Sequence, residues 1–178
     1  MFTTLITPLI ILLSYSIFND EIFNKFSFLI TSTGYLAIAY LTTVLVMPLI
    51  NFKNNIFNTK NIGVSAFYLS FLHLLLYIYD NNFEFSFLFE DLIYRNYITS
   101  GYIAFILLLP MYLTSFSFFK NKFPNWRKIH KIIYLIYVIT LVHIYFVIKA
   151  DYYYLFIFIM LFSIIVLFKL FSQKKNYE

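Results

Sequence analysis

The three histidines of this sequence, His73, His130 and His143, each lie within a long apolar stretch. An imidazole buried there without a partner costs roughly a few kcal/mol, so each ring should face the protein interior and bind something. The simplest partner is a neighbouring tyrosine or a backbone carbonyl. A neutral imidazole is also a metal ligand, which makes these three residues the candidates for chemistry.

His73 and His143 are expected at the same depth in a membrane. Each lies six residues before the same end of a predicted membrane span, which places both about 9 Å below one surface. Two imidazoles from two helices can bind a metal from opposite sides, and haem iron takes two axial ligands in that way. Haem with both axial positions filled has no vacancy for a substrate, which favours electron transfer. Zinc fits less well, because no third ligand is evident at that depth.

His130 lies 13 residues before His143, about 20 Å nearer to the opposite surface. On an ideal helix the two rings are rotated by about 220° from one another, so they do not share a face. We therefore expect His130 either to hold a second cofactor near the inner surface or to meet interfacial water or lipid phosphate.

The composition indicates which elements must position these residues. Of the 178 residues, 62% are hydrophobic and 12% are charged, with a mean hydropathy of +0.80. In soluble domains about 45–50% of residues are apolar and about 25% are charged. A soluble enzyme, a disordered segment and a collagen-like repeat are therefore excluded. Without cysteine the chain can form no disulfide, iron–sulfur or zinc–thiolate site. A polytopic helical membrane protein remains.

Six apolar stretches are long enough to cross a bilayer, which takes about 20 helical residues. We expect one domain over residues 1–178, an all-α bundle of six transmembrane helices with a haem between the third and fifth. No internal repeat or alternating barrel pattern is present. The first stretch lacks the positive region of a signal peptide and is expected to remain as a helix. The predicted spans are 2–18, 27–50, 62–79, 99–118, 129–149 and 152–171.

The charge between the spans predicts the orientation of the chain. Ten basic residues and one acid lie in segments 51–61 and 119–131 and at the C-terminal end, whereas three basic residues and seven acids lie in the opposite loops. The positive-inside rule therefore places both termini in the cytoplasm. The net charge of +5 follows from this topology, so we expect contact with membrane lipid and no nucleic-acid partner. The outer stretch 80–98, which has four phenylalanines beside acids, is expected to lie along the interface.

Several short motifs occur together in a recognisable order. They are Gly63-x-x-x-Phe67-Tyr68-x-x-x-x-His73, Glu90-Asp91-Leu92-Ile93-x-Arg95-x-Tyr97-Ile98-Thr99-x-Gly101, Leu109-Pro110-x-x-Leu113-Thr114-Ser115, Trp126-Arg127-x-x-His130-x-x-x-Tyr134 and Leu141-Val142-His143-x-Tyr145. With these motifs the sequence resembles the haem-binding membrane subunit of the bacterial protein-methionine-sulfoxide reductase system, within the ferric-reductase-like transmembrane family. The resemblance covers residues 60–150, and Thr33-Gly34 and Pro48 are its main anchors before that.

The resemblance implies a haem b carrier in the bacterial inner membrane that also binds FMN, with the family's ligand histidines at His73, His130 and His143. It implies that electrons pass from a cytoplasmic flavin reductase or from quinol to a periplasmic, molybdopterin-containing catalytic subunit. That partner would reduce methionine sulfoxide in oxidised proteins. This chain would then conduct electrons, and the methionine-sulfoxide reductase chemistry would belong to the partner.

Three departures from the family pattern limit what is carried over. Thr59-Lys60 stands where the family usually has an arginine pair, and a lone lysine lacks the bidentate fork that would hold a flavin phosphate. Asn96 replaces a usual proline. With three histidines in total, this chain alone cannot form two independent bis-histidine haem sites.

Two other functions are weighed against electron transfer to a partner. A self-contained haem-dependent ferric or quinone reductase would use the same cofactor site. A small transporter would need acidic residues or broken helices near the membrane midplane. The centres of the predicted spans contain no Asp, Glu, Lys or Arg, which disfavours the transporter.

Overall fold

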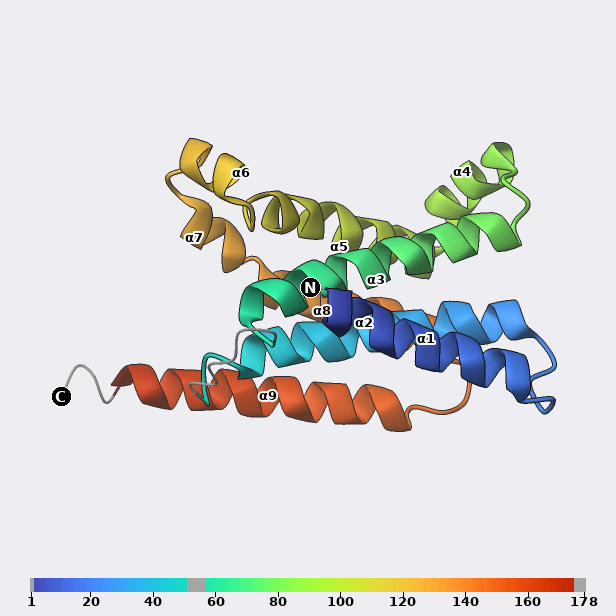
Figure 1. Cartoon of the computed structure of the whole chain (residues 1–178), viewed down its shortest axis with the longest axis horizontal. Helices are drawn as coiled ribbons and strands as arrows, with labels where there is room; N and C mark the ends of the chain where they lie inside the picture. The colour runs from blue at the N-terminus through green and yellow to red at the C-terminus, as the bar shows by residue number, and fades with distance from the viewer. Residues whose placement is uncertain (1, 51–56, 175–178) are drawn as a thin grey trace.

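The computed structural model describes residues 2–50 and 57–174, which form helices, turns and loops and contain no strand. The prediction of an all-α protein is confirmed for this part of the chain. Figure 1 shows the long helices lying alongside one another as a bundle. The helices are α1 (Phe2–Phe18), α2 (Lys25–Val46), α3 (Thr59–Asp80), α4 (Phe85–Tyr94), α5 (Asn96–Leu113), α6 (Ser117–Lys122), α7 (Trp126–His130), α8 (Ile133–Val147) and α9 (Tyr153–Lys174).

Five segments of the described chain are long and apolar enough to cross a membrane. They are α2, α3, α5, the α7–α8 segment Trp126–Val147, and α9. Helix α1 is apolar but has 17 residues, fewer than these five. The structure therefore supports five of the six predicted spans by length and composition. The remaining one, the first span at residues 2–18, stays a prediction.

Two of the predicted spans end earlier as helices than their hydropathy indicates. Helix α2 ends at Val46, two residues before Pro48, which has no backbone N–H to continue the helix. Helix α5 ends at Leu113, and the hydroxyl of the next residue, Thr114, donates to the carbonyl of Pro110 at 2.7 Å. The apolar residues beyond each end lie in turns or in the short helix α6.

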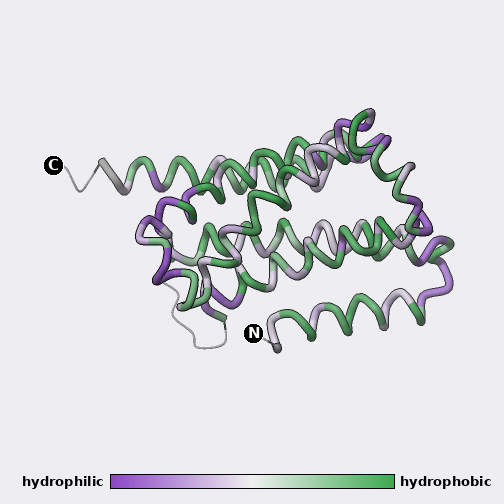
Figure 2. Tube along the Cα trace, turned by 90° about the horizontal axis from the view of Figure 1, so that it is seen from above, coloured by the Kyte–Doolittle hydropathy of each residue, from purple (hydrophilic) through white to green (hydrophobic). Residues whose placement is uncertain are grey.

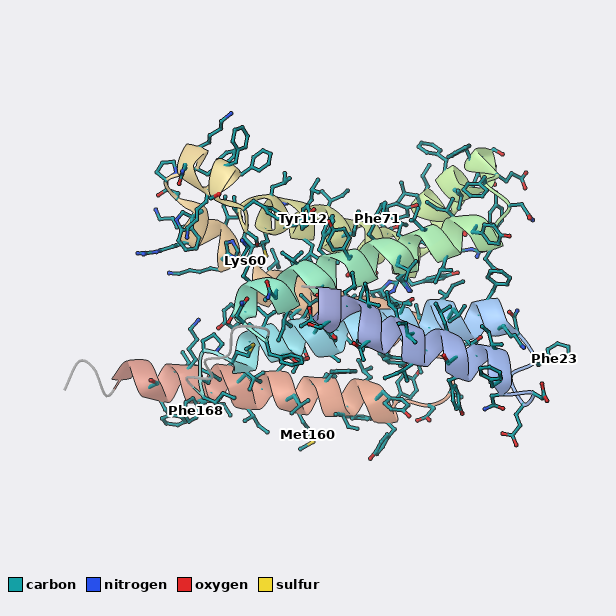
Figure 3. The ribbon with its side chains drawn as sticks, viewed as in Figure 1. Phe23, Lys60, Phe71, Tyr112, Met160 and Phe168 are labelled. Atoms are coloured by element: carbon teal, nitrogen blue, oxygen red, sulfur yellow. The ribbon has the colours of Figure 1, made fainter. Side chains whose placement is uncertain are left out.

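The core of the bundle lies where α2, α3, α5 and α8 meet. Helix α2 packs along α3, and α5 packs along α8. Each of the four contributes buried apolar side chains, and a small residue such as Ala66 allows close approach of the backbones, which is how membrane helices associate. Aromatic rings fill the contact between α3 and α5, where Phe67 stacks on Tyr112 with centroids 4.0 Å apart. Figure 3 shows Tyr112 and Phe71 along this contact.

The sides of the bundle present apolar residues outward. Met160 and Phe168 of α9 are 64% and 55% exposed, and Figure 3 shows both pointing away from the other helices. An extended apolar surface of this kind marks a region that meets lipid or another apolar surface. Together with the five long apolar helices, it gives a multi-pass membrane protein.

The polar segments lie at the two ends of the bundle. Helices α6 and α7 and the C-terminal end of α9 lie at one end, which we call the α7 end. Helix α4 and the turn after α1 lie at the opposite end, which we call the α4 end. Figure 2 shows hydrophilic segments at both ends and mainly hydrophobic ones between them. Lys53 and Lys175, which the charge pattern includes, lie outside the described residues.

The stretch predicted to lie along the interface forms α4. Its phenylalanines Phe85 and Phe89 are exposed, as an interfacial helix requires. Asp91 instead points inward and is 4% exposed. Its carboxylate accepts a hydrogen bond from the Tyr77 hydroxyl at 2.7 Å and pairs with Arg95 at 3.0 Å. The bond from Tyr77 attaches α4 to the end of α3, and the pair with Arg95 lies within the C-terminal turn of α4.

Candidate functional site

His73 of α3 and His143 of α8 lie in the same cavity, between the four core helices. Their ring centroids are 6.1 Å apart and their ring planes are perpendicular. The cavity has a volume of about 220 Å³, and apolar side chains from α2, α3, α5 and α8 form most of its wall. The structure thus brings together the two histidines that were expected at one depth.

Each imidazole is held by a helix other than its own. Nδ1 of His73 lies 2.8 Å from the carbonyl oxygen of Ile30 in α2, and Nδ1 of His143 lies 2.6 Å from that of Tyr97 in α5. Because a carbonyl oxygen can only accept, Nδ1 carries the proton in both rings. The other ring nitrogen, Nε2, then keeps its lone pair and is the atom that can bind a metal.

Two glycines provide the space that these rings occupy. A Cβ atom built on Gly34 would lie 3.1 Å from Cε1 of His73, and one on Gly101 would lie 3.0 Å from Cε1 of His143. Contacts this short require the ring to move. Gly34 is four residues after Ile30, and Gly101 is four residues after Tyr97. In each helix the glycine therefore lies on the same side as the carbonyl that accepts the imidazole N–H, and its missing side chain leaves room for the ring.

The spacing of the two rings matches a pair of axial ligands on one metal. A metal–imidazole bond of about 2.0–2.1 Å, with about 1.1 Å from nitrogen to ring centre, puts two such centres about 6.3 Å apart. The observed separation is 6.1 Å. Among the described residues, no group of three His, Cys, Asp or Glu side chains converges as a metal site. Two imidazoles in an apolar cavity between helices fit a haem, which needs two protein ligands, better than an ion that needs three or four.

His130 does not join this pair. It lies at the end of α7, where Nε2 is 3.1 Å from the hydroxyl oxygen of Thr114 and the ring meets Trp126 edge-on at 5.6 Å. It lines a second cavity of about 300 Å³, together with Lys60 and Lys120. The helix is also interrupted between His130 and Ile133, so the rotation expected for an ideal continuous helix does not apply. A second cofactor at His130 stays a prediction.

Sequence reasoning missed the residues that receive the two imidazoles. Carbonyls carry no sequence signal, and the roles of Gly34 and Gly101 follow from contacts between helices. One signal was present in the sequence, because all three glycines of the chain lie within apolar spans, and Gly34 and Gly101 differ from Gly63 in the residue that precedes them. Both follow a hydroxyl residue, Thr33 or Ser100. Glycine weakens a helix interior, so a glycine at such a position indicates close packing against it.

The fold and the site define a class of protein: a polytopic helical membrane protein that presents two imidazoles from different helices inside an apolar cavity. The family described as ferric reductase like transmembrane component matches residues 27–141, and the chain belongs to this family. The matched region runs from α2 into α8 and contains His73, His130 and both glycines of the cavity. It ends two residues before His143.

Relatives with a shared description are similar to this chain. The protein-methionine-sulfoxide reductase heme-binding subunit MsrQ of Caulobacter vibrioides is 33% identical over 120 residues, which are 65% of this chain and 54% of that protein. MsrQ of Deinococcus radiodurans is 33% identical over 94 residues, 52% of this chain and 46% of that protein. MsrQ of Xanthomonas campestris is 31% identical over 94 residues, which are 52% of this chain and 43% of that protein. The chain spans about half the length of these relatives. No solved structure matches it.

Proposed function

We propose that this chain is a membrane electron-transfer subunit that holds a haem b between α3 and α8, with Nε2 of His73 and Nε2 of His143 as the axial ligands. The observation that carries the proposal is the ring separation of 6.1 Å, with both Nδ1 protons already held by backbone carbonyls. The description of the relatives as heme-binding subunits supports the same cofactor. Helices α3 and α8 correspond to the third and fifth predicted spans.

A bound haem supplies one-electron exchange at its iron, and the protein residues set the conditions for it. With His73 and His143 both bound to the iron, no coordination position would remain for a substrate, which would favour electron transfer. The wall from α2, α3, α5 and α8 is mostly apolar, which disfavours water beside the two rings. The carbonyls of Ile30 and Tyr97 fix which ring nitrogen is free and how each ring is oriented.

We place the chain as a single domain in a bacterial inner membrane, with both termini and the α7 end in the cytoplasm. The charge of the described loops supports this orientation, because basic residues dominate α6 and α7. Electrons would enter from a cytoplasmic flavin reductase or from quinol. They would leave at the α4 end to a periplasmic, molybdopterin-containing methionine-sulfoxide reductase that repairs oxidised proteins. The shared description of the relatives as subunits of such a reductase supports this partner.

FMN is a separate prediction. The relatives are described by heme alone. The second cavity offers Lys60 and Lys120 as cations, and a flavin phosphate would find no arginine fork there among its lining residues. Titration of the purified chain with FMN, followed by flavin fluorescence, decides whether this cavity takes it.

Spectroscopy of the purified chain in detergent tests the haem assignment. The reduced protein should show the absorbance of a six-coordinate haem b, and His73→Ala or His143→Ala should each lower haem content by at least roughly tenfold, because an axial ligand is lost. His130→Ala is the matched control and should keep the spectrum. Normal haem content in both ligand variants would refute the assignment, and its loss in His130→Ala would mean that the ligands are paired differently.

A further inference from the structure

The two carbonyls that receive the imidazoles each accept a second side-chain hydrogen bond. The Thr33 hydroxyl lies 2.7 Å from the carbonyl of Leu29 and 3.0 Å from that of Ile30, so its single proton is shared between these two acceptors, and the Ser100 hydroxyl donates to the carbonyl of Tyr97 at 2.9 Å. The same arrangement therefore occurs twice, on α2 and on α5. A carbonyl at one residue is followed by a hydroxyl three residues later and by a glycine four residues later.

A hydroxyl that bonds back to its own helix is common in membrane helices and would mean nothing alone. Two hydroxyls that line this cavity, which Thr33 and Ser100 do not, also bond back to their own helices. Ser70 donates to Ala66 at 2.9 Å and Thr140 donates to Ile136 at 2.8 Å. Neither of those two carbonyls has an imidazole partner among the described hydrogen bonds. Thr33 and Ser100 differ because their acceptor oxygens are shared with His73 and His143.

Sharing an oxygen weakens each bond made to it. A carbonyl oxygen has two lone pairs, and in a helix one donor is already the N–H four residues later, which here belongs to a glycine. The hydroxyl is a further donor, so it competes with the Nδ1–H of the histidine for the same oxygen. A weaker Nδ1–H bond leaves the imidazole less electron-rich at Nε2, because partners of this kind raise the basicity of a ligand histidine.

We propose that Thr33 and Ser100 are positioning residues that set the strength of the two histidine–carbonyl hydrogen bonds and thereby raise the reduction potential of the haem. The inference rests on the proposed function for its cofactor. A less basic axial ligand stabilises the oxidised, more positive iron less, so the reduced form is favoured. Ser100 should act more strongly, because the Thr33 hydroxyl also lies 2.7 Å from the carbonyl of Leu29.

A redox titration of the purified full chain with its haem tests this. Ser100→Ala and Thr33→Val remove the competing donors, and both should shift the midpoint potential downward. At a fixed applied potential the ratio of reduced to oxidised haem should fall roughly threefold in Ser100→Ala, the size expected from part of one hydrogen bond, and by less in Thr33→Val. In the double variant this ratio should fall further. Thr33→Ser keeps the hydroxyl, so its midpoint potential should equal that of the wild type.

The sign of the shift separates this effect from a general loss of polarity. Removing a hydroxyl makes the cavity less polar, which disfavours the more charged oxidised state and raises the potential. The controls Ser70→Ala and Thr140→Val report that effect, because they remove hydroxyls that line the cavity and that share no acceptor with a histidine. They should leave the potential unchanged or raise it.

A second measurement needs no haem. The chain contains three histidines, so protein labelled with ¹⁵N-histidine gives three imidazole Nδ1 environments. In haem-free protein, Ser100→Ala should move the Nδ1 proton of His143 downfield as its hydrogen bond strengthens, and Thr33→Val should do the same for His73. The control variants should move neither proton.

The outcomes separate the two proposals. A wild-type protein that binds no haem overturns the proposed function, while the Nδ1 proton shifts still decide whether the hydroxyls set these bonds. A protein that binds haem but whose potential is unchanged or raised in Ser100→Ala and Thr33→Val overturns this inference and leaves the proposed function standing.

Discussion

Gly34 and Gly101 are the residues for which the site tolerates least change. Alanine at either position would place a methyl carbon 3.0–3.1 Å from an imidazole carbon, so the ring would have to shift by about a few tenths of an ångström from the position in which it bonds its carbonyl. We expect Gly34→Ala and Gly101→Ala to lower haem content by roughly 10–100-fold, the size typical of a lost ligand partner. Absorbance of the purified variants measures this.

The third glycine of the chain provides the control. A Cβ on Gly63 would lie 3.8 Å from Cγ2 of Val44, an ordinary contact. Gly63→Ala should therefore keep its haem, and the better helix propensity of alanine should leave its thermal stability equal or higher. Equal haem loss in all three variants would show that the glycines serve helix packing in general rather than the histidines.

His130 gives a second prediction at the level of single residues. Because it lies in the second cavity and contacts Thr114, His130→Ala should keep the haem at His73 and His143 while slowing its reduction from the α7 end. Stopped-flow reduction in membrane vesicles with the cytoplasmic face outward, using NADH to reduce the quinol pool, measures the rate. Ser163→Ala, which removes an exposed hydroxyl of α9 outside both cavities, serves as the control, and an unchanged rate in His130→Ala would assign His130 to packing alone.

At the level of elements, α4 depends on one buried carboxylate. Asp91 is held by the Tyr77 hydroxyl and by Arg95, and its loss would leave the Tyr77 hydroxyl without this acceptor, while Arg95 would keep its bond to the Tyr97 hydroxyl. We expect Asp91→Ala to destabilise the attachment of α4 by about 1–3 kcal/mol, which limited proteolysis within α4 would detect as faster cleavage. Glu90→Gln changes the neighbouring exposed acid and should cleave at the wild-type rate. Equal rates in both variants would contradict this role for Asp91.

The helices themselves follow largely from hydropathy, whereas their contacts do not. The spans beginning at 62 and 152 differ from α3 and α9 by one to three residues at each end, because about 20 apolar residues leave little choice of structure. Equal depth, read from residue counts, was enough to pair His73 with His143. The carbonyl partners on α2 and α5 depend on how each helix is rotated toward its neighbour, and in an apolar chain nearly every face is compatible with lipid. The burial of the Asp91 side chain could not be predicted from the sequence either, because it too depends on how a helix is rotated toward its neighbours.

For the whole molecule, the orientation in the membrane is open to a direct test. The chain has no cysteine, so a single introduced cysteine is the only labelling site. In intact cells, a membrane-impermeant maleimide should label Glu84→Cys at the α4 end and should leave Lys122→Cys at the α7 end unlabelled until the cells are opened. Both positions are exposed. The reverse pattern would invert the proposed direction of electron flow.

The anchoring of each imidazole by a helix other than its own has a consequence for speed. Turning either ring would require breaking a bond to a neighbouring helix and entering the space beside a glycine, so both rings are fixed before any cofactor arrives. A redox centre whose ligands are already immobile has little geometry to rearrange when its charge changes by one. If the proposed haem binds between these rings, the four core helices would keep its reorganisation energy small, which would speed electron transfer both into and out of the site.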